Sequence, residues 1–340
     1  MIDNSFNCFD IVVASWLAWK GFHFELMFSN CWGFSFKSSA SGLISDGLNE
    51  WAGEIGYPLE SYGGIKLITQ KSEAQNALSF VTKELQNDRP VILNTDTFWC
   101  PWHERYQRTK RLHSVIVLGM DTENCTLDCA DKYTWQSVHG SCKMSFNDFL
   151  NGYQSLTTIS FEKPMAGMDW RKIIRDAVLC MKNQADYDAI YYLKKGNFVE
   201  RTVLAFKLFQ FKFRKPLCFE EMRLLAQKVN ESSLENERST TIPLERNPLL
   251  VHLMLIAHGR KKFADTLKYL GEEQKIENLI YGARLMGNSA WQWGEAVGHL
   301  YNYFQTNDPN EKTRFCDGIK TVAIYEEMLA DMLIKLTSKR

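Results

Sequence analysis

The 340-residue sequence lacks net charge and any long apolar segment. Forty Lys and Arg residues balance 40 Asp and Glu residues, which argues against a general electrostatic attraction to nucleic acid or to an anionic membrane. No apolar run approaches the roughly 20 residues that a membrane-spanning helix requires. The opening Met-Ile-Asp-Asn also lacks the basic and apolar regions of a secretory signal peptide. We therefore expect a protein that binds neither nucleic acid nor membrane.

The cysteines show no regular pairing pattern. Nine Cys residues, an odd number, fall at irregular spacings, which favours reduced thiols in a cytoplasmic protein over a disulfide framework. With 45% hydrophobic residues, the chain is long enough for two domains. Residues 1–165 contain 13 Lys and Arg against 18 Asp and Glu, and the remainder contains 27 against 22. The basic second part is either a solvated surface or a docking face for an acidic partner.

The order of the predicted elements indicates an α+β domain followed by an irregular all-α domain. Residues 111–121 and 124–131 contain β-branched and apolar runs on either side of a Gly- and Asp-containing turn, as in a β-hairpin. From residue 169 onward the apolar spacing becomes helical, with no repeat period. The predicted helices cover residues 170–182, 199–211, 219–229, 249–270, 276–285, 291–304 and 320–336. We expect domains over residues 1–163 and 168–340.

Cys8 is the candidate nucleophile. The apolar residues from Phe9 to Leu17 follow the i, i+3, i+4, i+7 spacing of a helix that is packed on one face, so Cys8 falls in its first turn. The unpaired N–H groups and the positive end of the helix dipole favour a thiolate there. The backbone N–H of Cys8 is the expected oxyanion donor. Asn4 or Asn7 could supply a second donor, although each residue is equally typical of a surface or helix-capping position.

His113, at the start of the first hairpin strand, is the candidate base. A carboxylate near the end of the second strand would orient its ring. A turn centred on residues 120–121 sets Asp128 opposite His113, whereas a turn centred on residues 122–123 brings Asp131 close instead. The sequence leaves both registers open, and we take Asp128 as the orienting residue. The long polar and aromatic connection over residues 94–110 leads directly to His113, so we expect it to help form the substrate pocket.

Two other arrangements of the cysteines are weaker. A zinc site built from Cys125, Cys129, His139 and Cys142 is disfavoured because the first two, on one strand, would lie roughly 13 Å apart, which is too far for two ligands of one ion. Cys31 or Cys100 could replace Cys8 as the nucleophile. Neither precedes a helix pattern as clear as that after Cys8, and a thiol flanked by aromatic residues is most simply a buried hydrophobic residue.

This ordered set of residues resembles the papain-like C39 superfamily. More narrowly, it resembles the family of butirosin biosynthesis protein H, an acyltransferase that moves an aminoacyl chain from an acyl carrier protein thioester to an aminoglycoside amine. The resemblance covers most of the chain, including the helical second half. It rests on Cys8, on Glu25 ahead of the aromatic and glycine-containing stretch 28–36, on Asp96 with the segment from Trp99 to Tyr106, and on the hairpin from His113 to Asp128.

The resemblance implies a papain-like fold and acyl transfer through a Cys8 thioester, with His113 as base, Asp128 as orienting residue, and no bound cofactor or metal. The acyl or peptidyl donor would arrive on the phosphopantetheine arm of a carrier protein. A small-molecule amine or a peptide would accept it, or the chain would be released or cyclised, in the biosynthesis of an antibiotic or nonribosomal peptide. The candidate pocket residues are Asn4, Glu25, Asp96, Trp99, Tyr106 and Asp131, with the aromatic stretch.

Two further hypotheses remain at this stage. The first is a cysteine peptidase, amidase or thioesterase on the same fold. The second is a non-catalytic binding protein that retains the fold without a reactive thiol. Every one of these hypotheses is compatible with a homo-oligomer.

Overall fold

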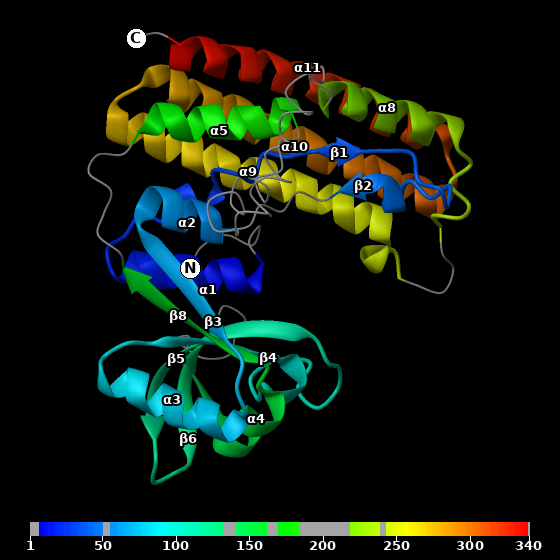
Figure 1. The fold of residues 1–340 in the computed structure, drawn as a ribbon. Coiled ribbons are helices and arrows are strands. Elements are labelled where there is room, and N and C mark those ends of the chain that lie inside the picture. Colours follow the sequence, from blue (N-terminus) through cyan, green and yellow to red (C-terminus); the bar gives the residue numbers. More distant parts are fainter. Residues whose placement is uncertain are drawn as a thin grey trace, which may run out of the picture. The chain divides into compact units, whose positions relative to one another are not determined.

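The computed structural model describes residues 7–49, 55–131, 141–161, 169–183, 218–238 and 243–338. The chain divides into two compact units, which are described separately (Figure 1). Unit 1 comprises Met1–Phe24 and Leu59–Ala166, and unit 2 comprises Glu25–Pro58 and Gly167–Arg340. The continuous first domain expected over residues 1–163 therefore differs from the structure, because residues 25–58 are packed within the helical unit.

Unit 1 is built on a six-stranded antiparallel sheet in the spatial order β3-β8-β4-β5-β6-β7 (Figure 1). β5 and β6 form the hairpin that the sequence predicted, and β4 pairs with the other edge of β5. The strands are β3 (Ile65–Gln70), β4 (Val91–Asp96), β5 (Leu112–Asp121), β6 (Thr126–Ala130), β7 (Ser141–Ser145) and β8 (Ser155–Phe161).

Apolar side chains on β4, β5 and β6 form the core of unit 1 together with two helices. Helix α3 (Ala74–Gln86) contributes Ala77 and Val81, and α4 (Phe146–Gly152) contributes Phe149. A third helix, α1 (Cys8–Trp19), packs against β5, which is buried at every position from His113 to Val117. The residues of the sheet in this core include Val91, Leu93, Val115, Val117, Leu127 and Cys129.

Unit 2 is mainly helical. The helices in its described residues from 169 onward are α5 (Trp170–Asn183), α8 (Cys218–Glu231), α9 (Pro248–Gln274), α10 (Glu277–Thr306) and α11 (Pro309–Ser338), with the 3-10 helix η4 (Leu244–Arg246). Residues 25–58 add η1 (Glu25–Phe28), the antiparallel pair β1 (Ser35–Phe36) and β2 (Leu48–Asn49), η2 (Ser45–Gly47) and the start of α2 (Gly56–Gly63). The α+β class is thus confirmed, whereas the papain-like fold stays a prediction.

The single helix α10 spans the two helices predicted at residues 276–285 and 291–304. Gly287 and Asn288 favoured a break between them. In the structure, a Cβ added at Gly287 would meet nothing within 4 Å, and Met286 and Trp293 continue the buried stripe on either side. Packing of that stripe therefore outweighs the low helix propensity of Gly287. The helix predicted over residues 199–211 lies outside the described residues.

The carboxylate of Glu326 on α11 fixes the aromatic segment to the helices of unit 2. Glu326 and Arg260 on α9 are both fully buried, and Arg260 donates to the two carboxylate oxygens at 3.0 and 3.1 Å. Arg260 also donates to the backbone carbonyl of Gly33 at 2.7 Å. The other donors to this carboxylate are the side chains of Trp32, Ser289 and Trp293. This network explains why the aromatic stretch belongs to unit 2 rather than to unit 1.

None of the helices in the described parts of the chain combines the length and apolar content that crossing a bilayer requires.

Replacing Glu326 by Ala is expected to lower the free energy of unfolding by about 3–5 kcal/mol, because Arg260 would stay buried without its counter-charge. Urea unfolding measures this difference. Glu327→Ala is the matched control, since Glu327 is the next residue on α11 and pairs with Arg223 at the surface. That change should lower the free energy of unfolding by less than about 1 kcal/mol. Similar losses in the two variants would contradict a structural role for the Glu326 network.

Candidate active site

Cys8 is the first residue of α1, as predicted. Asn7 caps this helix, and its Oδ1 accepts a hydrogen bond from the backbone N–H of Asp10 at 2.7 Å. Asn7 was expected to be either an oxyanion donor or a surface or capping residue, and the structure shows it as the helix cap. Asn4 lies outside the described residues. The Cys8 side chain is half-buried, and the backbone amides of Phe9 and Ser114 donate hydrogen bonds to it.

His113 lies between Cys8 and a buried carboxylate. Its ring hydrogen-bonds the Cys8 thiol, and its Nε2 lies 2.6 Å from Oδ2 of Asp131. The side chains of His113 and Asp131 are only 3% and 1% exposed, so solvent screens this contact weakly. Three side chains from α1, β5 and the end of β6 are thus brought together.

The charges in this trio favour a thiolate facing an imidazolium. Burial alone would lower the pKa of His113, but its hydrogen bonds and charge interactions with Asp131 and Cys8 outweigh burial and raise that pKa to about 9. Burial alone would raise the pKa of Cys8, but the hydrogen bond and positive charge of His113 outweigh it and lower that pKa below its ordinary value of 9.0. A larger share of the Cys8 sulfur is therefore in the thiolate form than in an ordinary cysteine at the same pH.

Asp131, rather than Asp128, orients His113. Alternate side chains of a strand face opposite sides, so Asp131 follows the buried Leu127 and Cys129 to the face that carries His113. Asp128 points to the other face, where its Oδ1 lies 3.2 Å from Nζ of Lys143. The strands pair with Asp121 opposite Thr126, which is close to the second of the two predicted registers. The choice of Asp128 is therefore wrong.

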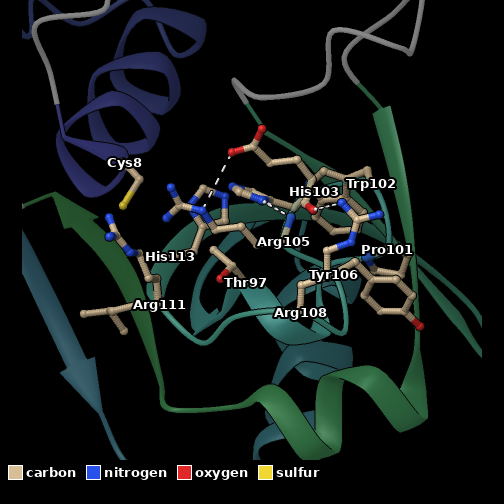
Figure 2. A pocket seen from close by; sticks show the side chains of 12 residues that line it. Cys8, Thr97, Pro101, Trp102, His103, Arg105, Tyr106, Arg108, Arg111 and His113 are labelled. Carbon is tan, nitrogen blue, oxygen red and sulfur yellow. Dashed lines mark hydrogen bonds and ion pairs between the residues drawn. The ribbon is translucent and has the colours of Figure 1, made fainter. Parts of the chain in front are cut away.

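The connection between β4 and β5 forms most of a pocket beside Cys8 and His113 (Figure 2). Its volume is about 750 Å³. Strand pairing places Thr95 opposite His113, so this connection starts and ends next to the base. Asp96 shapes it by accepting hydrogen bonds from the backbone N–H groups of Phe98 and Arg111 at 2.9 and 3.1 Å. The lining residues are Cys8, Thr97, Pro101, Trp102, His103, Glu104, Arg105, Tyr106, Arg108, Arg111, Leu112 and His113.

The predicted pocket residues are only partly brought together. Tyr106 lines the pocket, and its hydroxyl donates to Asp148 Oδ1 at 3.4 Å. Asp96 holds the backbone of the connection through these hydrogen bonds and is not one of the lining residues. Trp99 packs against α4, where a Cβ added at Gly152 would lie 2.7 Å from the Trp99 Cβ. Glu25 and the aromatic stretch belong to unit 2.

Trp102 and His103 are site residues that the sequence reasoning missed. The indole Nε1 of Trp102 donates to Asp131 Oδ2 at 2.7 Å, which gives this carboxylate a second partner. His103 places its ring centroid 5.4 Å from that of His113, and the backbone N–H of Arg105 donates to its Nδ1 at 3.1 Å. Burial and the positive charge of His113 lower the pKa of His103, which favours the neutral form of this pocket-lining imidazole. The only sequence signal for these two site residues is their position in the connection that leads to His113.

The other candidate cysteines lie in different environments. Cys31 and Cys100 are fully buried, and burial raises the pKa of Cys100. Cys129 and Cys142 face each other on β6 and β7, whereas Cys125 is exposed in the preceding turn. His139 of the disfavoured zinc arrangement lies outside the described residues. Within the described parts of the chain, no group of three or more His, Cys, Asp or Glu side chains has a metal-binding arrangement.

Comparison with known proteins adds one finding to this geometry. Residues 8–131 match the family model described as butirosin biosynthesis protein H, N-terminal. The matched segment begins at Cys8, contains the whole β4–β5 connection, and ends at Asp131, the residue that contacts His113. No curated protein matches the chain.

Replacing Asp131 by Asn is expected to move the reaction of Cys8 with iodoacetamide to higher pH. Loss of the carboxylate lowers the pKa of His113, and a neutral ring no longer lowers the pKa of Cys8. The alkylation rate of the Cys8 peptide, followed against pH by mass spectrometry, should have its midpoint below 9.0 in the unmodified protein and closer to 9.0 in the variant. Asp128→Asn removes a nearby charge of the same type and should leave the midpoint in place. An unmoved midpoint in Asp131→Asn would contradict the assignment of Asp131.

Proposed function

We propose that this protein is a cysteine-dependent acyltransferase of specialised-metabolite biosynthesis, since residues 8–131 match the family model of the N-terminal part of butirosin biosynthesis protein H, a family of antibiotic biosynthesis. The observation that carries the proposal is the contact of His113 with both Cys8 and Asp131. Cys8 and His113 also line the pocket. A reactive thiolate that opens onto a cavity is what covalent acyl transfer requires.

In the first half-reaction, the Cys8 thiolate attacks the carbonyl carbon of an acyl thioester. A bond forms between Sγ and this carbon, and the bond to the donor sulfur breaks as the tetrahedral intermediate collapses. The departing thiolate takes the proton of the His113 imidazolium, which leaves a neutral ring and an acylated Cys8. The backbone N–H of Cys8, in the first turn of α1, is an oxyanion donor for the intermediate.

In the second half-reaction, an amine attacks the carbonyl carbon of the Cys8 thioester. The neutral His113 takes one proton from the attacking nitrogen, a carbon–nitrogen bond forms, and the Cys8 thiolate leaves. The products are an amide and the original thiolate–imidazolium pair. Asp131 keeps the His113 ring in one orientation through both steps and stabilises its positive charge.

The donor is proposed to be an acyl, aminoacyl or peptidyl chain on the phosphopantetheine arm of a carrier protein, so the enzyme needs no cofactor of its own. The acceptor is a small-molecule amine. Water or a nucleophile within the chain would convert the same covalent intermediate into a released or cyclised product, which makes thioesterase or cyclase activity the alternative outcome of the same first step.

Incubation with an acyl N-acetylcysteamine thioester is expected to add the mass of one acyl group to the protein and none to Cys8→Ala. Intact-mass spectrometry measures the adduct, and addition of an amine should discharge it as the amide. Cys125→Ala is the control, because Cys125 is an exposed thiol in the turn after β5, away from the pocket lining. An adduct that persists in Cys8→Ala would overturn the nucleophile. Cleavage of peptides without any thioester would instead indicate a peptidase or amidase.

A further inference from the structure

Trp102 contacts the carboxylate that orients the catalytic imidazole. Its indole Nε1 donates to Oδ2 of Asp131 at 2.7 Å, and Nε2 of His113 lies 2.6 Å from the same oxygen. The Asp131 side chain is 1% exposed, so this carboxylate is stabilised by protein donors rather than by bulk water. The indole itself takes no part in either half-reaction of acyl transfer.

The Asp131 side chain needs contacts that fix its orientation. β6 ends at Ala130, so Asp131 lies one residue past the strand. The carboxyl group of an aspartate rotates over a broad range about its Cβ–Cγ bond, so contacts with neighbouring groups decide which oxygen faces the imidazole. Two donors on one oxygen, from Trp102 and His113, restrict this rotation.

The apolar core of unit 1 holds the Trp102 ring. Trp102 lies in a turn in which the backbone N–H of His103 donates to the carbonyl of Cys100 at 2.9 Å. Its half-buried side chain packs against the core that includes Cys100 and Phe149. An indole N–H lies in the plane of its ring, so the packing of the ring also sets the direction of the N–H group. Trp102 therefore offers Asp131 a donor of fixed direction.

Titratable side chains from several elements interact with the charge of Asp131. They include His113 on β5, His103 and Cys100 in the β4–β5 connection, and Cys129 on β6. Burial raises the pKa of both thiols and lowers the pKa of His103, which favours the neutral form of all three. In His113 the hydrogen bonds and charges of its partners outweigh burial, and the pKa rises to about 9. The orientation of Asp131 therefore matters chiefly for His113.

We propose that Trp102 is a positioning residue, whose indole N–H holds the Asp131 carboxylate in the orientation that keeps His113 protonated and Cys8 ionised. Its effect reaches the sulfur only through Asp131 and His113. Trp102 also lines the pocket beside Cys8, so one side chain joins the wall of the acyl site to the catalytic acid (Figure 2). The inference rests on the proposed function, because it assigns Trp102 to the same thiolate–imidazolium pair.

Two replacements of Trp102 remove the N–H group. Trp102→Phe keeps an aromatic ring, and benzothienylalanine at this position keeps the shape of the indole with sulfur in place of N–H. Both should move the midpoint of Cys8 alkylation by iodoacetamide to higher pH, because a less well oriented carboxylate stabilises the imidazolium less. At neutral pH, the rate constant measured on the Cys8 peptide should fall about five- to tenfold.

A double-mutant cycle tests whether the indole acts through Asp131. In an Asp131→Asn background, Trp102→Phe should change the rate constant at neutral pH by less than about twofold, because no carboxylate is left to orient. An equal fall in both backgrounds would show that Trp102 acts independently of Asp131 and would overturn the proposal. An unmoved midpoint with benzothienylalanine would do the same, because this isostere lacks only the N–H donor.

Trp99→Phe is the matched control. Trp99 belongs to the same connection but packs against α4, outside the pocket lining, so its replacement should leave the alkylation midpoint in place. Equal shifts in Trp99→Phe and Trp102→Phe would overturn the specific role of Trp102. Urea unfolding separates a local effect from loss of the fold, since the benzothienylalanine variant keeps the packing of the ring and should unfold at the same urea concentration as the unmodified protein.

Acylation by an acyl N-acetylcysteamine thioester separates this inference from the proposed function. Both Trp102 variants should be acylated at Cys8 about five- to tenfold more slowly than the unmodified protein. Unchanged acylation in these variants, beside a normal adduct in the unmodified protein, would overturn the role of Trp102. If the unmodified protein forms no adduct, the proposed acyl transfer fails, and the alkylation midpoints alone decide the role of Trp102.

Discussion

The contact between His113 and Asp131 is the interaction on which the site depends. A buried imidazolium is stable only beside a counter-charge, and here the two side chains are 3% and 1% exposed with 2.6 Å between Nε2 and Oδ2. The same carboxylate accepts the indole N–H of Trp102. Asp131 thus links β5, the end of β6 and the pocket wall, and through His113 it sets the charge of Cys8 at the start of α1.

The position of the pocket follows from the pairing of β4 with β5. Their register puts Thr95 opposite His113, so the connection from β4 to β5 begins and ends beside the base. This segment folds as consecutive turns, and the side chains that it contributes to the cavity include Trp102, His103 and Arg105. His113 and most of the pocket wall therefore belong to one unit, made of the antiparallel strands β4 and β5 and the connection between them.

The sequence-based errors in the fold have a common cause. Residues 25–58 were placed in the first domain because they follow Cys8 along the chain, but Arg260 and Glu326, more than 200 positions later, hold Trp32 and Gly33. The break expected within α10 came from a local propensity that packing overrides at Gly287. Neither feature of the fold could be predicted from residues close together in the sequence, because the contacts that determine it join distant segments of the chain.

The sequence by itself determined the parts of the site that local physics encodes: a helix that begins at Cys8, the β5–β6 hairpin, and an imidazole at the start of its first strand. Apolar periodicity and turn residues act over a few positions, so they can be recognised in the chain. Tertiary structure alone decided that Asp131 orients the ring and that Asp128 faces Lys143. A strand alternates faces at every residue, and the position of one turn therefore decides which of two acids reaches the histidine.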